Sequence, residues 1–243
     1  MLKLVAFSLT LFALNATLFA TDYSPNSIPY PTGFPVIERE GYTVGYDSRN
    51  RIPLWTQEHL TKDNVSGKIS RRFRFKTDPD IYELHVSTNE DYTGSGFDRG
   101  HMVPDADRDN TLDILKETYL YSNACPQNHP FNDGVWGDLE DHARDLVMEL
   151  GYDSADVISG PLFMPFERED GKWYVQYQVI GKNRVAVPTH FFKIIHANRG
   201  EETDTWAYII PTTEGYESEN LDDFLTTISA VEFASGLKFN HFE

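Results

Sequence analysis

Strand-like runs constrain the fold of this 243-residue chain more than any other feature. In these runs β-branched and aromatic residues recur at alternate positions, which is typical of strands with one buried face. Turn-forming residues separate them, and the glycine-containing turn 181–184 predicts a hairpin. The predicted strands are 42–46, 52–58, 156–159, 173–180, 184–195 and 206–210.

Helical spacing of apolar residues is found in three segments, 111–117, 133–150 and 220–230. The clearest is 133–150, in which apolar residues recur every three or four positions and Gly151 follows as a terminator. Strands therefore outnumber helices, and the two do not alternate regularly. This pattern predicts an α+β fold with a central, mostly antiparallel sheet flanked by helices.

The first twenty residues differ from the rest of the chain. Residues 4–19 are almost wholly apolar and follow Lys3, as in a secretory signal peptide, and they are short for a membrane span of ~20 apolar residues. This predicts a secreted or periplasmic protein rather than a mitochondrial one, with no stable membrane association after cleavage; a retained anchor is the alternative. The expected division is a signal peptide at 1–20, an extended proline-containing arm at 21–37 and one domain at 38–243.

The net charge of −17 argues against a large nucleic-acid-binding surface, because such binding relies on Lys and Arg at phosphates. A local basic stripe can still bind while the rest of the surface repels. The alternative interpretation of such a cluster is a solvated strand edge or loop. The candidate stripe consists of Lys68, Arg71, Arg72, Arg74 and Lys76.

Several kinds of chemistry are excluded by what the sequence lacks. There is no Gly-rich phosphate loop, no Cys/His zinc spacing and no HExxH run. The single cysteine, Cys125, cannot form an intrachain disulfide, and its neighbours Ala124 and Pro126 favour a small buried residue over a nucleophile. These observations favour a reaction that uses an activated water and a metal ion.

His101 is the candidate base for such a reaction. It ends the run Asp98-Arg99-Gly100-His101, and a histidine with a pKa near neutrality is suited to taking a proton from water. The flanking glycines would let the backbone approach a ligand closely. The alternative is a structural histidine, since the chain has eight of them.

Asn132 and Glu140 are the candidate metal ligands. With Trp136 between them, their spacing of four and eight residues places them on one face of a helix. Amide and carboxylate oxygens suit Mg²⁺, which keeps several waters and needs few protein ligands. The alternatives are a helix cap for Asn132 and a solvated side chain for Glu140.

Two arginines complete the candidate site. Arg99 adjoins His101, and Arg144 lies one turn beyond Glu140. The forked guanidinium donors of arginine suit phosphate oxygens. An ion pair between Arg144 and Glu140 is the alternative, and the two roles are compatible.

Three segments, 91–101 (DYTGSGFDRGH), 121–127 (YSNACPQ) and 132–140 (NDGVWGDLE), occur in an order and at separations that are specific. Together they resemble the DNA/RNA non-specific endonuclease family, the ββα-metal nucleases, and within it the endonuclease G branch. Shorter matches extend the likeness over residues 38–240. The resemblance implies a nuclease that uses Mg²⁺, or Mn²⁺ in its place, in a family whose members commonly form homodimers. It would cleave single- and double-stranded DNA and RNA to 5′-phosphate ends.

The resemblance also implies roles for individual residues. The family has one more arginine, which lies before the histidine motif in the sequence. Phe73 stands at that position here, and its neighbours Arg72 and Arg74 both remain candidates for substrate contact. Cys125 stands where the family usually has Ala, Thr or Ser. The implied roles are general base for His101, metal ligand for Asn132, holder of metal-bound water for Glu140, support of the site for Asn123, and phosphate contact for Arg99 and Arg144.

Two other functions stay open at this point. The acidic charge motivates a catalytically inactive nucleic-acid-binding module of the same fold, which would bind tightly without metal-stimulated cleavage. The other alternative is a phosphodiesterase acting on small nucleotides, which would prefer a dinucleotide to long DNA.

Overall fold

A computed structural model describes residues 34–212 and 220–239. The predicted signal peptide and most of the predicted arm therefore lie outside the described residues. Strand β1 (Val36–Glu38) contains the end of that arm and pairs with the next strand. The sheet thus begins two residues before the boundary expected at residue 38.

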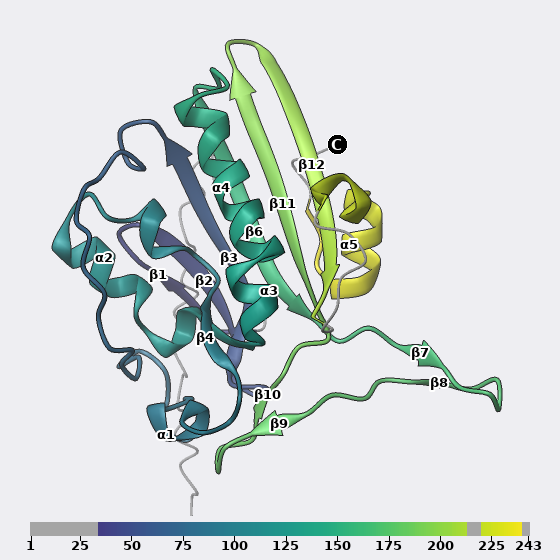
Figure 1. The fold of residues 1–243 in the computed structure, drawn as a ribbon. Coiled ribbons are helices and arrows are strands. Elements are labelled where there is room, and N and C mark those ends of the chain that lie inside the picture. Colours follow the sequence, from purple (N-terminus) through teal and green to yellow (C-terminus); the bar gives the residue numbers. More distant parts are fainter. Residues whose placement is uncertain (1–33, 213–219, 240–243) are drawn as a thin grey trace, which may run out of the picture.

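One seven-stranded sheet organises the described chain (Figure 1). Its order is β1–β2–β3–β6–β11–β12–β13, and every neighbouring pair is antiparallel. The predicted α+β fold with a mostly antiparallel central sheet is therefore confirmed. The strands after β1 are β2 (Tyr42–Asp47), β3 (Ile52–Thr61), β6 (Ser154–Leu162), β11 (His190–Arg199), β12 (Glu202–Pro211) and β13 (Leu225–Thr226).

Three two-stranded ribbons lie outside this sheet, and the ribbon of β7 and β8 projects from the body of the molecule (Figure 1). The predicted strand 173–180 is wrong as a continuous strand, because only its two ends find a pairing partner. The hairpin predicted at 181–184 is confirmed, with positive φ at Gly181 and Arg184. The ribbons are β4 (Asp98–His101) with β5 (Ala124–Gln127), β7 (Phe166–Glu167) with β8 (Trp173–Tyr174), and β9 (Val179–Ile180) with β10 (Val185–Ala186).

Helices cover both faces of the sheet. Along β11, Phe191 packs with Trp136 of helix α4 on one face, and Phe192 packs with Val231 of helix α5 on the other, as strand alternation requires. No helix in the described part of the chain is long and apolar enough to cross a membrane. The helices are α1 (Asn89–Tyr92), α2 (Leu112–Thr118), α3 (His129–Asp133), α4 (Val135–Met148) and α5 (Ile228–Ser235), with 3₁₀ turns η1 (Asp105–Asp107), η2 (Tyr121–Asn123) and η3 (Leu221–Phe224).

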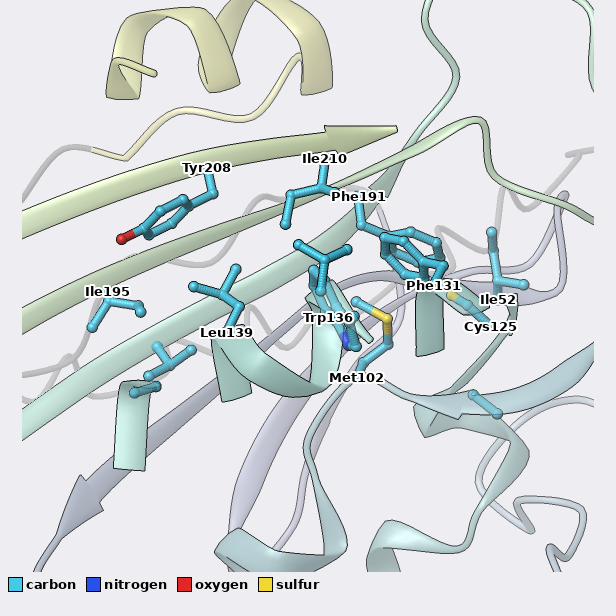
Figure 2. Packing of buried hydrophobic residues seen from close by; sticks show 14 of the residues in the cluster. Ile52, Met102, Cys125, Phe131, Trp136, Leu139, Phe191, Ile195, Tyr208 and Ile210 are labelled. Carbon is cyan, nitrogen blue, oxygen red and sulfur yellow. The ribbon is translucent and has the colours of Figure 1, made fainter. Parts of the chain in front are cut away.

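The core on the α4 side is rich in aromatic residues (Figure 2). The ring of Phe131 stacks on Trp136 and on Phe191, with centroid separations of 5.5 Å and 5.2 Å. Cys125 is fully buried in the same core, and burial raises the pKa of its thiol well above the usual value. A thiol that stays protonated is a poor nucleophile, so the interpretation of Cys125 as a small buried residue is confirmed.

The helix predicted at 133–150 is confirmed as α4 (Val135–Met148), but Asn132 lies before it in a separate short helix, α3. Asn128 caps α3 by accepting a hydrogen bond from the Phe131 N–H, and Gly134 then breaks the helix with φ −106° and ψ −119°. A Cβ atom on Gly134 would lie 2.6 Å from the Pro130 carbonyl oxygen, so the tight junction requires glycine. Asn132 and Glu140 consequently lie on different helices, and their predicted shared helix face is wrong.

The helix predicted at 220–230 is also wrong. This segment contains two separate N-caps: Asn220 accepts from the Asp222 N–H, and Thr227 accepts from the Ala230 N–H. The first starts only the short turn η3, and β13 then adds to the edge of the sheet. The second starts α5, which continues past the predicted end to Ser235.

Candidate active site

The candidate site is built on a strand–strand–helix unit outside the central sheet, formed by β4, β5 and α3. Antiparallel pairing places Gly100 opposite Cys125 and His101 opposite Ala124. A Cβ atom on Gly100 would lie 1.9 Å from the Gln127 side-chain oxygen, so glycine allows the two strands to come together. Gly100 therefore serves strand packing rather than the ligand approach that the sequence suggested.

His101 ends β4, and aromatic rings enclose its imidazole. The ring centroids of Phe75 and Tyr119 lie 4.8 Å and 4.9 Å from that of His101. Its Nε2 atom is buried and has no hydrogen-bond partner among the described residues. The pKa of His101 is lowered to about 4, mainly by burial; the charge of Asp105 opposes this shift and that of Arg72 adds to it. The imidazole is therefore neutral at pH 7 and able to accept a proton.

The aromatic enclosure was missed by sequence reasoning, although a signal was present. Between residues 72 and 75 basic and aromatic side chains alternate. Phe73 and Phe75 point inward onto Tyr119, with centroids 5.6 Å and 5.3 Å away, while Arg72 and Arg74 are exposed. The basic residues Arg72 and Arg74 thus lie on the exposed face of an extended segment. Its inner face packs on Tyr119 and, through Phe75, on His101.

Asn123 supports the backbone that follows His101. Its side-chain amide donates to the carbonyl oxygens of Val103 and Thr118 at 2.9 Å and 3.0 Å. Its side-chain oxygen accepts from the Val103 N–H at 2.9 Å, and Asn123 itself is fully buried. This arrangement fits the expected supporting role and leaves the side chain without access to substrate.

Asn132 lies in α3 beside the start of β4. Its side-chain amide nitrogen is 3.3 Å from the Asp98 carboxylate, which also accepts from His129 at 2.9 Å. Since the nitrogen faces Asp98, the amide oxygen points away from that carboxylate and is available to a cation. Asp98 was missed as a contact of Asn132, although it stands three residues before His101 in the same run.

Glu140 lies in the second turn of α4 and is half-buried. Burial raises the pKa of its carboxyl to about 8, while the charges of Lys193 and Arg144 favour the carboxylate. In the part of the chain that the structure describes, no group of three or more His, Cys, Asp or Glu could by itself hold a metal ion. A cation at Asn132 and Glu140 would therefore keep most of its ligands as water, which is the preference of Mg²⁺.

Arg144 is held by two aspartates. Its guanidinium donates to Asp107 at 2.6 Å and to Asp141, and these two residues take the place of Glu140, which was the alternative ion-pair partner. The side chain is still partly exposed. Asp107 belongs to η1, which also carries Asp105, and this 3₁₀ turn therefore links Arg144 to the surroundings of His101.

Arg99 lies on β4 and is oriented by neighbouring side chains. Its Nε donates to the Tyr121 hydroxyl at 3.1 Å, and one terminal nitrogen donates to the Asn89 side chain at 3.0 Å. Its guanidinium also lies over the Tyr92 ring, 5.4 Å from the centroid. Residues 99 and 101 share one face of the strand, because strand side chains alternate. The structure thus brings Arg99 and His101 to one face of the β4–β5–α3 unit.

Comparisons with known proteins agree with this arrangement. The family model described as "DNA/RNA non-specific endonuclease" matches residues 21–242. Human "Endonuclease G, mitochondrial" is 41% identical over 203 residues, covering 83% of this chain and 68% of the relative. "Nuclease 1, mitochondrial" of Schizosaccharomyces pombe is 38% identical and covers 90% of this chain and 70% of its own. A crystal structure of the EndoG/EndoGI complex superposes with TM-score 0.83 at 35% identity, covering 88% of this chain and 89% of the other.

These relatives correct one prediction. The apolar leader predicted a secreted or periplasmic protein, but endonuclease G and Nuclease 1 are named as mitochondrial proteins. The predicted location is therefore wrong. It rested on residues 1–20 alone, which lie outside the described residues, and an apolar run without the arginine-rich amphipathic pattern does not identify the compartment.

The motifs around His101 and Asn132, the antiparallel sheet and the whole-chain similarity point to one group of proteins. The expected resemblance to this group, including endonuclease G, is confirmed by sequence and by fold. The chain belongs to the DNA/RNA non-specific endonuclease family and is a nuclease that acts on nucleic acid.

Proposed function

We propose that this nuclease is a metal-dependent, sugar-non-specific endonuclease that cleaves single- and double-stranded DNA and RNA to 5′-phosphate ends, with His101 as general base. The observation that carries the proposal is the His101 imidazole, which is enclosed by Phe75 and Tyr119, unpaired at Nε2 and neutral at pH 7. A neutral, oriented imidazole is the form that accepts a proton from water.

In the proposed reaction a water oxygen attacks the phosphorus atom while its proton passes to His101. The bond between phosphorus and the 3′ oxygen then breaks. The phosphate stays on the 5′ side, and the 3′ oxygen leaves with a proton taken from water. Asn123 keeps the backbone after His101 in place through its contacts with Val103 and Thr118.

The residues near the site fit a hard divalent cation. Asn132 would hold it through the amide oxygen that faces away from Asp98, and Glu140 would hold a metal-bound water. When bound, Mg²⁺, or Mn²⁺ in its place, supplies positive charge that stabilises the negative charge growing on the phosphate. The charge of Arg144 also acts on Glu140, so the ion pairs of Arg144 would help to hold that carboxylate in place.

Arginines would place the scissile phosphate. Arg99 is the first candidate, because Tyr121 and Asn89 orient its guanidinium beside His101. Of the two upstream arginines, Arg72 is favoured over Arg74, because its charge reaches the His101 imidazole. Arg144 would act at a distance, since Asp107 and Asp141 already neutralise much of its charge.

Digestion of plasmid DNA and of RNA with Mg²⁺ tests the proposal. Wild-type protein should degrade both, a chelator should stop the reaction, and His101→Ala should lose activity by a factor of at least ~10². His196→Ala is the matched control, because His196 lies on β11 and bonds Thr205. Undiminished cleavage by His101→Ala would refute the base assignment. Binding without metal-stimulated cleavage would favour the inactive module, and faster cleavage of a dinucleotide than of DNA would favour the small-nucleotide enzyme.

We propose further that the chain forms a homodimer through the arm 166–179, which contains the β7–β8 ribbon. Five large apolar side chains on this projecting segment are at least 40% exposed: Phe166, Trp173, Val175, Tyr177 and Val179. The last four are alternate residues of the returning half of the arm. An isolated two-stranded ribbon is marginally stable in water, so a partner surface would stabilise it.

A second copy is the proposed occupant because the arm, unlike the whole chain, is close to neutral in charge. It carries three acidic and two basic residues, so two arms repel far less than two whole chains of net charge −17. A cavity of about 450 Å³ at the base of the arm is lined by Met164, Pro165 and Pro188 among others. Two arms related by a two-fold axis would each place their Trp173 tip near the base of the other.

Light scattering without nucleic acid tests this dimer. Wild type should have twice the chain mass, and Trp173→Ser should shift the equilibrium towards monomer. Phe233→Ser is the control, because Phe233 is 92% exposed but lies on α5. A monomeric wild type, or a Trp173→Ser protein that stays dimeric, would exclude this interface.

A further inference from the structure

Lys193 is a charged residue in an otherwise apolar row. Along β11 the side chains that face α4 are Phe191, Lys193, Ile195 and Ala197, and all four are buried. Lys193 is only 1% exposed. Since its neighbours in the row are fully apolar, an apolar side chain would suit this position by packing alone, and burying an ammonium group is unfavourable unless it is paired.

The ammonium group of Lys193 has two close contacts. It donates to the Ser159 hydroxyl on the adjacent strand β6 at 2.9 Å. It also lies 4.3 Å from the ring centroid of Trp136, a favourable cation–π distance. Trp136 stands one helical turn before Glu140 on α4. The lysine charge is therefore placed beneath the turn of helix that carries Glu140.

Other charges complete a buried layer between α4 and the sheet. Glu58 pairs with Arg108 at 2.8 Å, and both side chains are nearly inaccessible. Asp107 pairs with Arg144 at 2.6 Å. With Glu140 and Lys193 the layer holds three carboxyl groups and three basic groups. Glu58 and Asp107 thus have arginine partners at ion-pair distance, whereas Lys193 forms no direct ion pair with a described carboxylate; its charge favours the Glu140 carboxylate more than the charge of Arg144 does.

We propose that Lys193 is a positioning residue that fixes the Glu140 carboxylate from below, so that it faces the metal-bound water rather than the core. This inference rests on the proposed metal site at Asn132 and Glu140. Lys193 does not touch substrate; it acts through Glu140 and through the helix turn that begins at Trp136. The buried pair Glu58–Arg108 would in turn keep Lys193 from pairing with Glu58 instead.

Metal binding without nucleic acid is the decisive measurement. Mn²⁺ binding to the full chain, followed by electron paramagnetic resonance, should weaken about 10-fold or more in Lys193→Met, as is typical of residues behind a metal ligand. Lys193→Arg keeps the charge and should recover part of the affinity. In DNA cleavage at saturating Mg²⁺, Lys193→Met should lower kcat and leave KM for DNA within about twofold of the wild-type value.

Two controls separate positioning from packing. Ile195→Met changes an apolar neighbour in the same row and should leave Mn²⁺ affinity unchanged. Lys193→Gln can keep a hydrogen bond to Ser159 without the charge, and it decides the matter if Lys193→Met fails to fold. A folded Lys193→Gln or Lys193→Met protein that binds Mn²⁺ within twofold of wild type overturns the proposal.

Asn132→Ala distinguishes this failure from failure of the metal site itself. If wild type binds Mn²⁺ and Asn132→Ala does not, the site is correct and the lysine variants test positioning alone. If wild type binds no Mn²⁺, or Asn132→Ala binds it equally well, the proposed metal site is wrong and the role of Lys193 falls with it.

Discussion

The ring of Phe75 packs against the imidazole of His101, with centroids 4.8 Å apart and planes inclined by 47°. Phe75 and Tyr119 both exclude water from the imidazole, and burial is the main cause of the low pKa of His101, about 4. The same contact therefore orients the proposed base and keeps it unprotonated. Its removal should change both properties.

Replacement of Phe75 should shift the pH dependence of cleavage. Phe75→Ala admits water, so the pKa of His101 should rise from about 4 towards 6.5. Because the proposed base must be neutral, the acid limb of the kcat/KM profile should move to higher pH. Phe73→Ala is the control, since Phe73 packs on Tyr119 instead. An acid limb that stays in place in Phe75→Ala would show that the contact does not set the pKa.

The stability of the protein should also depend on His101. A histidine whose pKa is lower in the folded state binds its proton more tightly in the unfolded chain. Stability is therefore lost as pH falls from about 6.5 to about 4. In chelator, the free energy of unfolding of His101→Leu should lack this loss, which approaches ~1.4 kcal/mol per pH unit. His129→Leu is the control and should keep the loss of stability at low pH, because Asp98 raises the pKa of His129 instead of lowering it. Parallel curves for wild type and His101→Leu would contradict the prediction.

The two upstream arginines should differ in effect. Arg72 lies close enough for its charge to act on His101, so Arg72→Ala should lower kcat/KM on DNA more than Arg74→Ala does. Each phosphate contact that is lost should also reduce the salt slope by about 1. Cleavage rates measured at several salt concentrations test both expectations. An equal or reversed order would assign the phosphate contact to Arg74 instead.

Nucleic-acid binding as a whole should depend only weakly on salt. With a net charge of −17 and a short basic stripe, we expect few phosphate contacts. The slope of log affinity against log salt should therefore be well below that of about ten contacts. Fluorescence anisotropy with His101→Ala in chelator measures this without cleavage. A slope that corresponds to ten contacts would reveal a basic surface beyond residues 68–76.

Cys125 should be inert in the native protein. It is fully buried opposite Gly100, and burial raises the pKa of its thiol. A thiol reagent should label it only after unfolding and should leave nuclease activity unchanged, as should Cys125→Ala. Rapid labelling with loss of activity under native conditions would show that β5 opens more readily than its burial implies.

The sequence predicted the elements whose physical cause is local. The helix predicted at 111–117 is α2, which Thr111 caps, and Gly181 and Arg184 form the predicted hairpin. The separate helix α3 before α4 could not be predicted in the same way. The spacing of Asn132 and Glu140 suggested one helix, and only the close approach of Gly134 to the Pro130 carbonyl explains why α3 and α4 are separate.

For the site, sequence motifs supplied His101, Asn132 and Glu140 but not their surroundings. Asp107, which neutralises Arg144, and Phe75, which covers His101, lie far along the chain from the residues they contact. Such contacts depend on the path of the loops between strands. The role proposed for Lys193 could not be predicted either. A lysine within a strand is normally expected to face solvent, and only the structure shows that its side of β11 is buried.

The β4–β5–α3 unit shares no strand with the seven-stranded sheet. Arg99, His101 and Asn132 thus stand on backbone outside that sheet, although Cys125 and Phe131 of the same unit pack into the core. Selection for activity can therefore act on His101 without acting on the strands of the sheet. A lineage that no longer needs to cut nucleic acid could lose His101 and keep the rest intact, so a recognisable fold is no guarantee of a working enzyme in this family.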